Sequence, residues 1–538
     1  MGFDYLYAMG EIFNLYRMNG SFTFNGSVSG NALGDFMLGD VYSFLQGGGE
    51  FAHRQGTLVG AFFQDTIRAS KKLTLTLGVR YDPYTPFLDK LDGETECYNP
   101  GQKSARYPNA PLGMIFQGDP GCPGSSDKTL FGPRLGFSYD VTGRGKTVVR
   151  GGYGIFYQPA FTEMYNGMVD SAPFSPQIAL NNVNFATPYA NTPNPFPANF
   201  GPLNPPPSAQ FQTPVVNVSF ANNWKPAQVQ SWNLTLEHQL SSSWLLRTAY
   251  VASKGTFLPY NLQLNPSQYV AGATTATTNN RRPLYGNGFA SMIQDQSEGN
   301  SNFNSLQVTV EKRFASNFSG LASFTRSKSI DENSGSEDVG DGASIINPYN
   351  ARAYRALSDF DVPNRFVMSF VYQMPKLANR SALVRTALGG WQASGIWTWE
   401  SGFPFAVTSG QDRSLTGNGL DLANLTGNPY LSPDRARGAL INEYFNTTAF
   451  ALATLGTFGN EGRNIIFGPG TFNLDCGVMK FFQFGERFRL QFRAEAYNVT
   501  NTPQFDNPDI GAPTDPRFGQ ITAARGARIF QGALKLAF

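Results

Sequence analysis

The sequence predicts an all-β chain that folds as an antiparallel transmembrane β-barrel. Three observations predict it: apolar and polar residues alternate along many segments, short polar turns alternate with long polar loops, and no apolar run approaches the ~18 residues of a membrane-spanning helix. The chain has 538 residues, of which 41% are hydrophobic and 14% aromatic. Its 57 glycines and 35 prolines imply many turns, but they are too few for a collagen or a disordered polymer.

The alternation has a period of two. In 73–82 the odd positions are Leu, Leu, Leu, Val and Tyr, whereas the even positions are Thr, Thr, Gly, Arg and Asp. Similar segments occur at 232–237, 306–311 and 488–496. Successive side chains of a strand point to opposite faces, so each segment has one apolar and one polar face.

Many of these strands are paired by short polar turns, and the pairs are separated by much longer loops. The short turns are 69–72, 140–146, 241–243, 315–317 and 485–487, and the long loops are 83–129, 158–226, 254–301, 331–361, 400–471 and 501–528. One end of the sheet therefore carries tight turns and the other carries long loops, the pattern of short periplasmic turns and long extracellular loops.

We expect about 14 strands, an even number that returns both termini of an antiparallel barrel to one side. Their predicted centres are Phe22, Phe62, Leu77, Leu135, Tyr153, Leu234, Tyr250, Val308, Phe324, Phe370, Gly395, Phe482, Phe492 and Leu534.

Charges of both signs occupy the polar face. We expect nine of them to face a water-filled lumen, while the apolar rows face lipid: Arg80, Asp82, Arg134, Arg150, Glu311, Arg313, Arg489, Arg493 and Glu495. The alternative is a soluble, multi-sandwich binding protein, in which the apolar rows would meet in a dry core.

Composition excludes other classes. Lys+Arg is 41 and Asp+Glu is 39, a net charge of +2 that gives no support for a nucleic-acid partner. Three cysteines exclude a disulfide-stapled scaffold, and two histidines argue against a His-based metal site. His53 and His238 have no adjacent nucleophile signature. We therefore predict neither an enzyme nor a bound cofactor or metal.

The chain ends on an aromatic residue inside an alternating segment. Apolar residues stand at Phe530, Leu534, Leu536 and Phe538. This arrangement resembles the insertion signal read by the outer-membrane barrel assembly machinery, and that machinery and outer-membrane lipid are predicted partners. The alternative is an ordinary last strand that happens to end in Phe.

Several phrases together resemble the barrel of TonB-dependent outer-membrane receptors of the Oar-like group. They are Gln64-Asp65, LTLTLGVRY at 73–81, GPRLGF at 132–137, RGGYGIFY at 150–157, FTRSKSID at 324–331 and RAEAYN at 493–498. The resemblance implies a 22-stranded barrel, an N-terminal plug, often a preceding carboxypeptidase-regulatory-like domain, and a motif that pairs with TonB.

None of those N-terminal parts is recognisable here, so we expect residues 1–538 to be the C-terminal portion of the barrel. The resemblance implies uptake of a nutrient (a carbohydrate, a peptide or a chelate) across the bacterial outer membrane, with the TonB complex as a partner only where a plug is present. A passive pore or a surface-adhesion barrel is the alternative, and a secreted, glycan-binding β-protein is a third possibility.

Cys97 and Cys122 lie 25 positions apart in one long loop, where a disulfide is plausible; the alternative is two free thiols. We expect Cys476 to be a packed residue of a strand.

Trp391, Trp397 and Trp399 share one side of their segment. We expect them to form part of an aromatic girdle at the lipid–water boundary rather than a sugar-stacking platform.

One outer loop carries an acidic run, for which a solvated loop is favoured over a calcium site: Asp331, Glu332, Glu337, Asp338 and Asp341.

Overall fold

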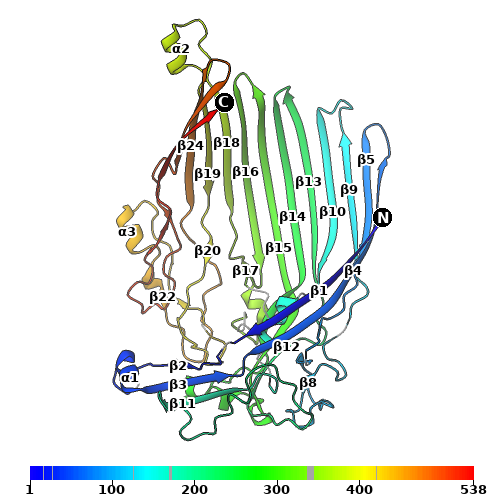
Figure 1. Ribbon diagram of the computed structural model, residues 1–538, viewed down its shortest axis with the longest axis vertical. Helices are drawn as coiled ribbons and strands as arrows, with labels where there is room; N and C mark the ends of the chain where they lie inside the picture. Colours follow the sequence, from blue (N-terminus) through cyan, green and yellow to red (C-terminus); the bar gives the residue numbers. More distant parts are fainter. Residues whose placement is uncertain are drawn as a thin grey trace.

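A tall curved wall of β-strands dominates the computed structural model of the chain (Figure 1). The structure describes residues 1–15, 17–26, 28–91, 93–124, 126–160, 162–168, 172–335, 345–419 and 421–538. Within these residues one sheet contains 17 strands. Three of them are short: β6 (Leu88–Asp89), β12 (Val215–Phe220) and β17 (Ala356–Leu357).

The other strands of this sheet are long and make the wall. They are β1 (Gly2–Asn14), β4 (Glu50–Arg68), β5 (Leu73–Tyr81), β9 (Phe131–Asp140), β10 (Thr147–Gln158), β13 (Ala227–Ser241), β14 (Trp244–Gln263), β15 (Phe289–Ala315), β16 (Phe318–Asp331), β18 (Asn364–Gln373), β19 (Gln392–Glu400), β24 (Thr471–Phe484), β25 (Phe488–Tyr497) and β28 (Ile529–Ala537).

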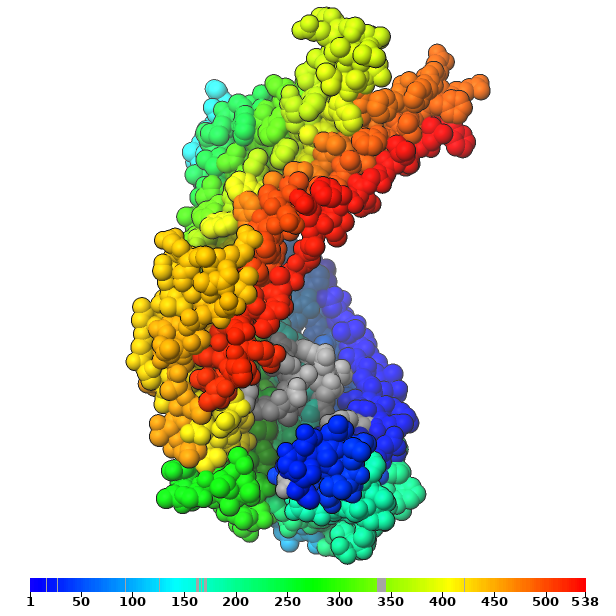
Figure 2. All heavy atoms as spheres, turned by 90° about the vertical axis from the view of Figure 1, so that its left-hand side faces the viewer, coloured from blue at the N-terminus to red at the C-terminus, as the bar shows by residue number. Residues whose placement is uncertain are grey.

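Each wall strand pairs antiparallel with the next one along the chain, from β1 through to β28. The five predicted short turns join neighbouring strands at one end, which is at the top in Figure 1. The long loops gather at the other end. In the described part of the chain β1 and β28 do not pair with each other, and Figure 2 shows these blue and red ends of the wall on either side of a hollow.

The prediction of a wall strand at Phe22 is wrong. Phe22 belongs to β2 (Ser21–Thr23), in a separate sheet with β3 (Asp40–Gly47) and β11 (Gln177–Asn184). The first wall strand is β1, whose outward residues Phe3 and Tyr5 are exposed. Its inward positions include Leu6 and Ala8, which weakens the apolar–polar contrast. Ala8, like Leu58 of β4, packs against a cluster of loop residues inside the wall.

The remaining elements are short and lie mainly among the loops. The two-stranded sheets pair β7 (Glu96–Tyr98) with β8 (Met114–Phe116), β20 (Pro404–Phe405) with β23 (Ile466–Phe467), β21 (Asn424–Leu425) with β22 (Phe450–Ala451), and β26 (Gln504–Phe505) with β27 (Ala524–Arg525). The α-helices are α1 (Ala32–Leu38), α2 (Ala382–Leu388) and α3 (Arg437–Asn442). Short 3₁₀ turns occupy Thr162–Met168, Thr275–Thr277, Asn279–Arg281, Tyr285–Asn287, Ala351–Tyr354 and Thr447–Ala449. Within the described residues, no helix is both long enough and apolar enough to cross a membrane.

The apolar rows of the wall are at its surface. Leu77, Leu135 and Leu234 are 42%, 51% and 53% exposed. The buried apolar clusters of the described residues instead lie among the long loops, around Tyr165 and around Phe445 for example. The apolar rows of the wall therefore do not form the dry core between two sheets that the soluble-sandwich alternative requires.

Some strands are much longer than a membrane requires. β15 runs for 27 residues, about 90 Å at the usual rise per residue. A tilted strand crosses a bilayer in about 9–11 residues. The first residues of β15, 289–295, therefore extend among the long loops, where β12 pairs with them in parallel.

Candidate functional site

The pairing register places the predicted lumen-facing charges on one face of the wall. Arg80 lies opposite Gly132, Arg134 opposite both Gly78 and Gly154, and Arg150 opposite Ser138. The same face continues through Glu311, and Arg313 lies two residues further along the same strand. It ends at Arg493 and Glu495, which lie opposite Met479 and Gly477. Strand alternation places Arg489 on this face too, and Asp82 follows directly after β5. We call this surface the polar face.

Ion pairs join residues of different strands on the polar face, in one case across the strand that lies between them. The Arg80 guanidinium contacts Asp4 Oδ2 at 2.6 Å and Asp82 Oδ1 at 2.7 Å. Glu237 lies between Arg150, at 3.3 Å, and Arg247, at 2.9 Å. Sequence reasoning did not assign Asp4 or Arg247 to this surface, although both stand at alternating positions of their strands.

The other predicted charges make looser contacts. Arg313 Nε is 3.8 Å from Glu311 Oε1, and Arg493 Nε is 3.6 Å from Glu495 Oε2. Arg134 lies 5.0 Å from the ring centre of Phe156, and Arg489 lies 3.7 Å from that of Phe481. Exposed ion pairs contribute about 0–1 kcal/mol each, so these charges make the surface polar more than they stabilise the sheet.

Two hollows open on the polar face. One of about 840 Å³ spans β15 to β25 and includes Glu311, Arg313, Asp475 and Glu495 in its lining. Another of about 330 Å³ is lined in part by Asp4, Arg80, Asp82, Arg134 and Tyr157. Both linings include charges of both signs.

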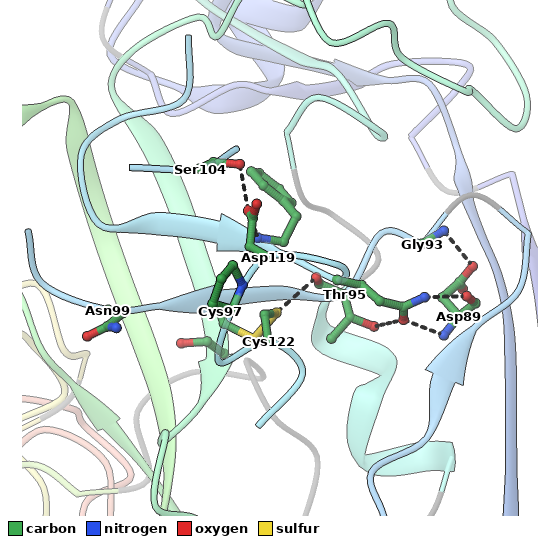
Figure 3. Close-up of a disulfide and its surroundings, with 12 residues drawn as sticks. Asp89, Gly93, Thr95, Cys97, Asn99, Ser104, Asp119 and Cys122 are labelled. Atoms are coloured by element: carbon green, nitrogen blue, oxygen red, sulfur yellow. Dashed lines mark hydrogen bonds between the residues drawn. A yellow bond between two sulfur atoms is a disulfide. The ribbon is translucent and has the colours of Figure 1, made fainter. Parts of the chain in front are cut away.

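The first large outer loop is closed by a disulfide between Cys97 and Cys122, whose Cα atoms are 5.8 Å apart (Figure 3). Both half-cystines are buried against Ile115. Cys97 lies in β7, and Cys122 follows the β8 strand that pairs with β7. The third cysteine, Cys476, is a free, half-buried residue of β24.

The carboxylate of Asp119 organises the backbone next to this disulfide. It accepts hydrogen bonds from the Ser104 hydroxyl at 2.6 Å and from the Ala105, Arg106 and Phe116 amides at 2.9, 3.0 and 3.0 Å. Burial opposes the charge, but these donors outweigh it and lower the pKa of Asp119. The loop is thus tied by polar contacts as well as by the disulfide.

A second loop unit, residues 401–470, has a buried carboxyl group at Glu461. Its Oε1 accepts a hydrogen bond from the Val407 amide at 3.0 Å. Its Oε2 is buried with no hydrogen-bond partner among the described residues. Burial raises the pKa of Glu461 to about 8, although the Val407 amide opposes the shift.

Arg463 anchors this second unit to the end of β16 and to β17. Arg463 is buried, with 6% of the residue exposed. Its guanidinium binds Asp331 and donates to the Leu357 carbonyl at 3.1 Å. Glu332 accepts from the Asn300 amide at 2.8 Å. Asp331 and Glu332 therefore hold loops together, whereas Glu337, Asp338 and Asp341 of the acidic run lie outside the described residues.

The predicted girdle and insertion residues share the face opposite the polar face. Trp397 and Trp399 pair with Leu474 and Phe472. Trp391 lies just before β19, and about 26 Å of strand separate it from Trp399, close to the ~25 Å height of a barrel's apolar band. The four C-terminal residues are strongly exposed on the same outward face: Phe530, Leu534, Leu536 and Phe538.

The family described as "Outer membrane beta barrel domain" matches residues 1–531. No curated protein matches the chain. Among solved structures, the outer membrane transporter YddB from Escherichia coli is 10% identical with a TM-score of 0.45, and the match covers 92% of this chain and 49% of that one.

Two further solved structures are similarly distant. The ferripyoverdine receptor of the outer membrane of Pseudomonas aeruginosa is 10% identical with a TM-score of 0.42, over 91% of this chain and 39% of that one. The FrpB iron transporter from Neisseria meningitidis is 9% identical with a TM-score of 0.40, over 92% and 52%. The chain thus spans about half or less of the length of these structures.

The wall, with polar and apolar residues on opposite faces, defines an outer-membrane β-barrel protein. The chain belongs to the outer membrane beta barrel domain family. The predicted fold class and the predicted location in the bacterial outer membrane are therefore confirmed. The roles of individual residues of the polar face stay predictions.

Proposed function

We propose that residues 1–538 form the barrel wall of a TonB-dependent receptor that takes up a nutrient across the outer membrane. The observation that carries this proposal is the separation of faces: charges paired across strands on one face, and exposed Leu, Phe and Trp rows on the other. The Oar-like phrases of the sequence add support for the receptor type.

In this proposal, the long loops capture the solute outside the cell and the polar face provides its route inward. A route lined by both signs of charge attracts water and polar solutes without trapping one ion. A carbohydrate, a peptide or a chelate fits such a surface. Outer-membrane lipid contacts the apolar rows, and the assembly machinery reads the strand that ends at Phe538.

Uptake by cells that carry the whole protein tests the proposal. We expect a proton-motive-force uncoupler, or loss of the TonB partner, to abolish accumulation of radiolabelled oligosaccharides, peptides or metal chelates. Accumulation that persists after uncoupling would favour the passive pore. Binding to cells or matrix without any uptake would favour the adhesion barrel.

A further inference from the structure

One connection at the short-turn end of the wall is unlike the others. β18 ends at Gln373 and β19 begins at Gln392, so residues 374–391 connect two neighbouring strands, whereas two to six residues suffice at the other short connections. This 374–391 segment contains α2, which projects beside the C-terminus at the top of Figure 1.

A lysine of the apolar face holds the segment in place. Lys480 pairs with Phe492, which pairs with Leu534, so Lys480 belongs to the outward-facing row. The lysine is nevertheless 4% exposed. Its Nζ donates to the Gly389 carbonyl at 2.6 Å and also to the Thr386 carbonyl.

These two carbonyls lie at the C-terminal end of α2, where a cation is favoured by the helix dipole. A long lysine side chain reaches from an apolar surface toward a polar boundary in this way. Trp391 completes the attachment: its Nε1 donates to the Ala387 carbonyl at 2.8 Å, and its ring lies 5.3 Å from Lys480 Nζ. The segment is therefore fixed at the rim of the lipid-facing side of the wall.

The composition of the segment matches that position. Its charged residues are Lys376, Arg380 and Arg385, all exposed, and it contains no Asp or Glu. Leu383 and Leu388 are 81% and 63% exposed. Exposed leucines beside cations suit the boundary between acyl chains and phosphate groups, where Lys and Arg side chains are attracted to anionic lipid.

We propose that the 374–391 segment binds anionic phospholipid headgroups at the membrane surface on the short-turn side. The leucines enter the acyl boundary, and Lys376, Arg380 and Arg385 contact lipid phosphates. The inference depends on which face of the wall meets lipid, and it is independent of what the barrel transports. Loss of uptake with intact lipid binding would overturn only the proposed function.

The test uses the full chain in mixed micelles. A bimane fluorophore is attached to Leu383→Cys in a Cys476→Ser background, and brominated phosphatidylglycerol or brominated phosphatidylcholine is added as quencher. Two triple variants are compared: Lys376→Gln/Arg380→Gln/Arg385→Gln, and a control, Lys71→Gln/Arg144→Gln/Lys146→Gln, which removes three exposed cations from other turns at the same end.

We expect phosphatidylglycerol to half-quench at a concentration at least about tenfold lower than phosphatidylcholine. The first triple variant should lose this preference and the control should keep it, with inorganic phosphate having no effect. Equal quenching by both lipids, or equal preference in both triple variants, would overturn the proposal. Quenching by aqueous iodide in place of lipid, or displacement of the lipid by inorganic phosphate, would also overturn it.

Discussion

At the scale of single residues, the most consequential group in the loops is the buried carboxyl of Glu461. The usual glutamate pKa is 4.5, and burial raises the pKa of Glu461 to about 8. Between these two pH values the folded loop retains a proton that the unfolded loop has lost. Stability therefore falls as the pH rises through this window, by about 1.4 kcal/mol per pH unit, and is constant below it and above it.

Glu461→Gln should remove this dependence, because an uncharged amide replaces the carboxyl and can still accept a hydrogen bond from Val407. We expect protection of the 401–470 amides, measured by hydrogen–deuterium exchange corrected for intrinsic rates, to decline from pH 6.5 to pH 8 in the wild type only. This range lies above the pKa of about 6 to which burial raises Asp421 of the same loop. Asp434→Asn, at an exposed carboxyl of the same loop, is the control and should retain the decline. If protection of these amides still declined with pH in Glu461→Gln, another titratable group would be responsible for the pH dependence.

At the scale of elements, the disulfide between Cys97 and Cys122 and the last strand, β28, each lead to a prediction. The disulfide closes a loop of 25 residues, for which chain entropy gives about 3 kcal/mol of stabilisation. It lies among outer-loop residues and outside the strand ladder, which the adjoining Thr95 and Glu96 contact through Arg54 of β4 and the Val218 amide of β12. Its removal should thus loosen the loop without disturbing the sheet.

Cys97→Ser/Cys122→Ser should accelerate proteolysis within 83–129, while the heat-modifiable mobility of the folded wall stays unchanged. Cys476→Ser removes the free thiol of β24 and is the matched control, which should leave loop cleavage at the wild-type rate. Equal cleavage of the double variant and the wild type would show that Asp119 and the other polar contacts suffice.

Phe538 provides a test at the last strand. Its side chain is 94% exposed on the outward face, so folded-state packing explains little of its presence. We expect Phe538→Ala to reduce the fraction of chain assembled in outer membranes several-fold, with Lys535→Ala, on the opposite face of β28, close to wild type. Normal assembly of Phe538→Ala would favour an ordinary last strand.

The success of sequence reasoning differs between elements for physical reasons. Alternation identified the strand around Leu77 because only one of its faces is apolar. The alternation pattern did not reveal β1, because its inner face also carries an apolar residue, Ala8, which packs against loop residues. The contact between Arg463 and Asp331 joins residues 132 positions apart, and α2 depends on Lys480 in a distant strand, so neither was visible as a local pattern.

At the scale of the whole molecule, the wall depends on a consistent difference between its two faces. Leu234 is exposed on the outward face, and its neighbour Asn233 is exposed on the polar face. Both lie in the middle of β13 and share the same backbone surroundings. They therefore offer a matched test of which face meets hydrocarbon.

Leu234→Arg should destabilise the membrane-inserted wall by about 2–4 kcal/mol, the cost of a cation near the bilayer midplane. Asn233→Arg should change the stability of the inserted wall by less than about 1 kcal/mol, because the polar face is solvated. Urea unfolding in lipid vesicles measures both. Similar costs for the two variants would contradict the assignment of faces.

Between the few bulges of the wall, the regular strand register also limits how the gene can change. Deleting one codon inside β13 would rotate the side chains beyond the deletion by half a turn, so that Glu237 would face the bilayer and Leu236 the water. A deletion of two codons would preserve the orientation, and deletions in 401–470 would not alter it at all. We therefore expect related genes to differ in length within their outer loops, and within wall strands only by pairs of codons.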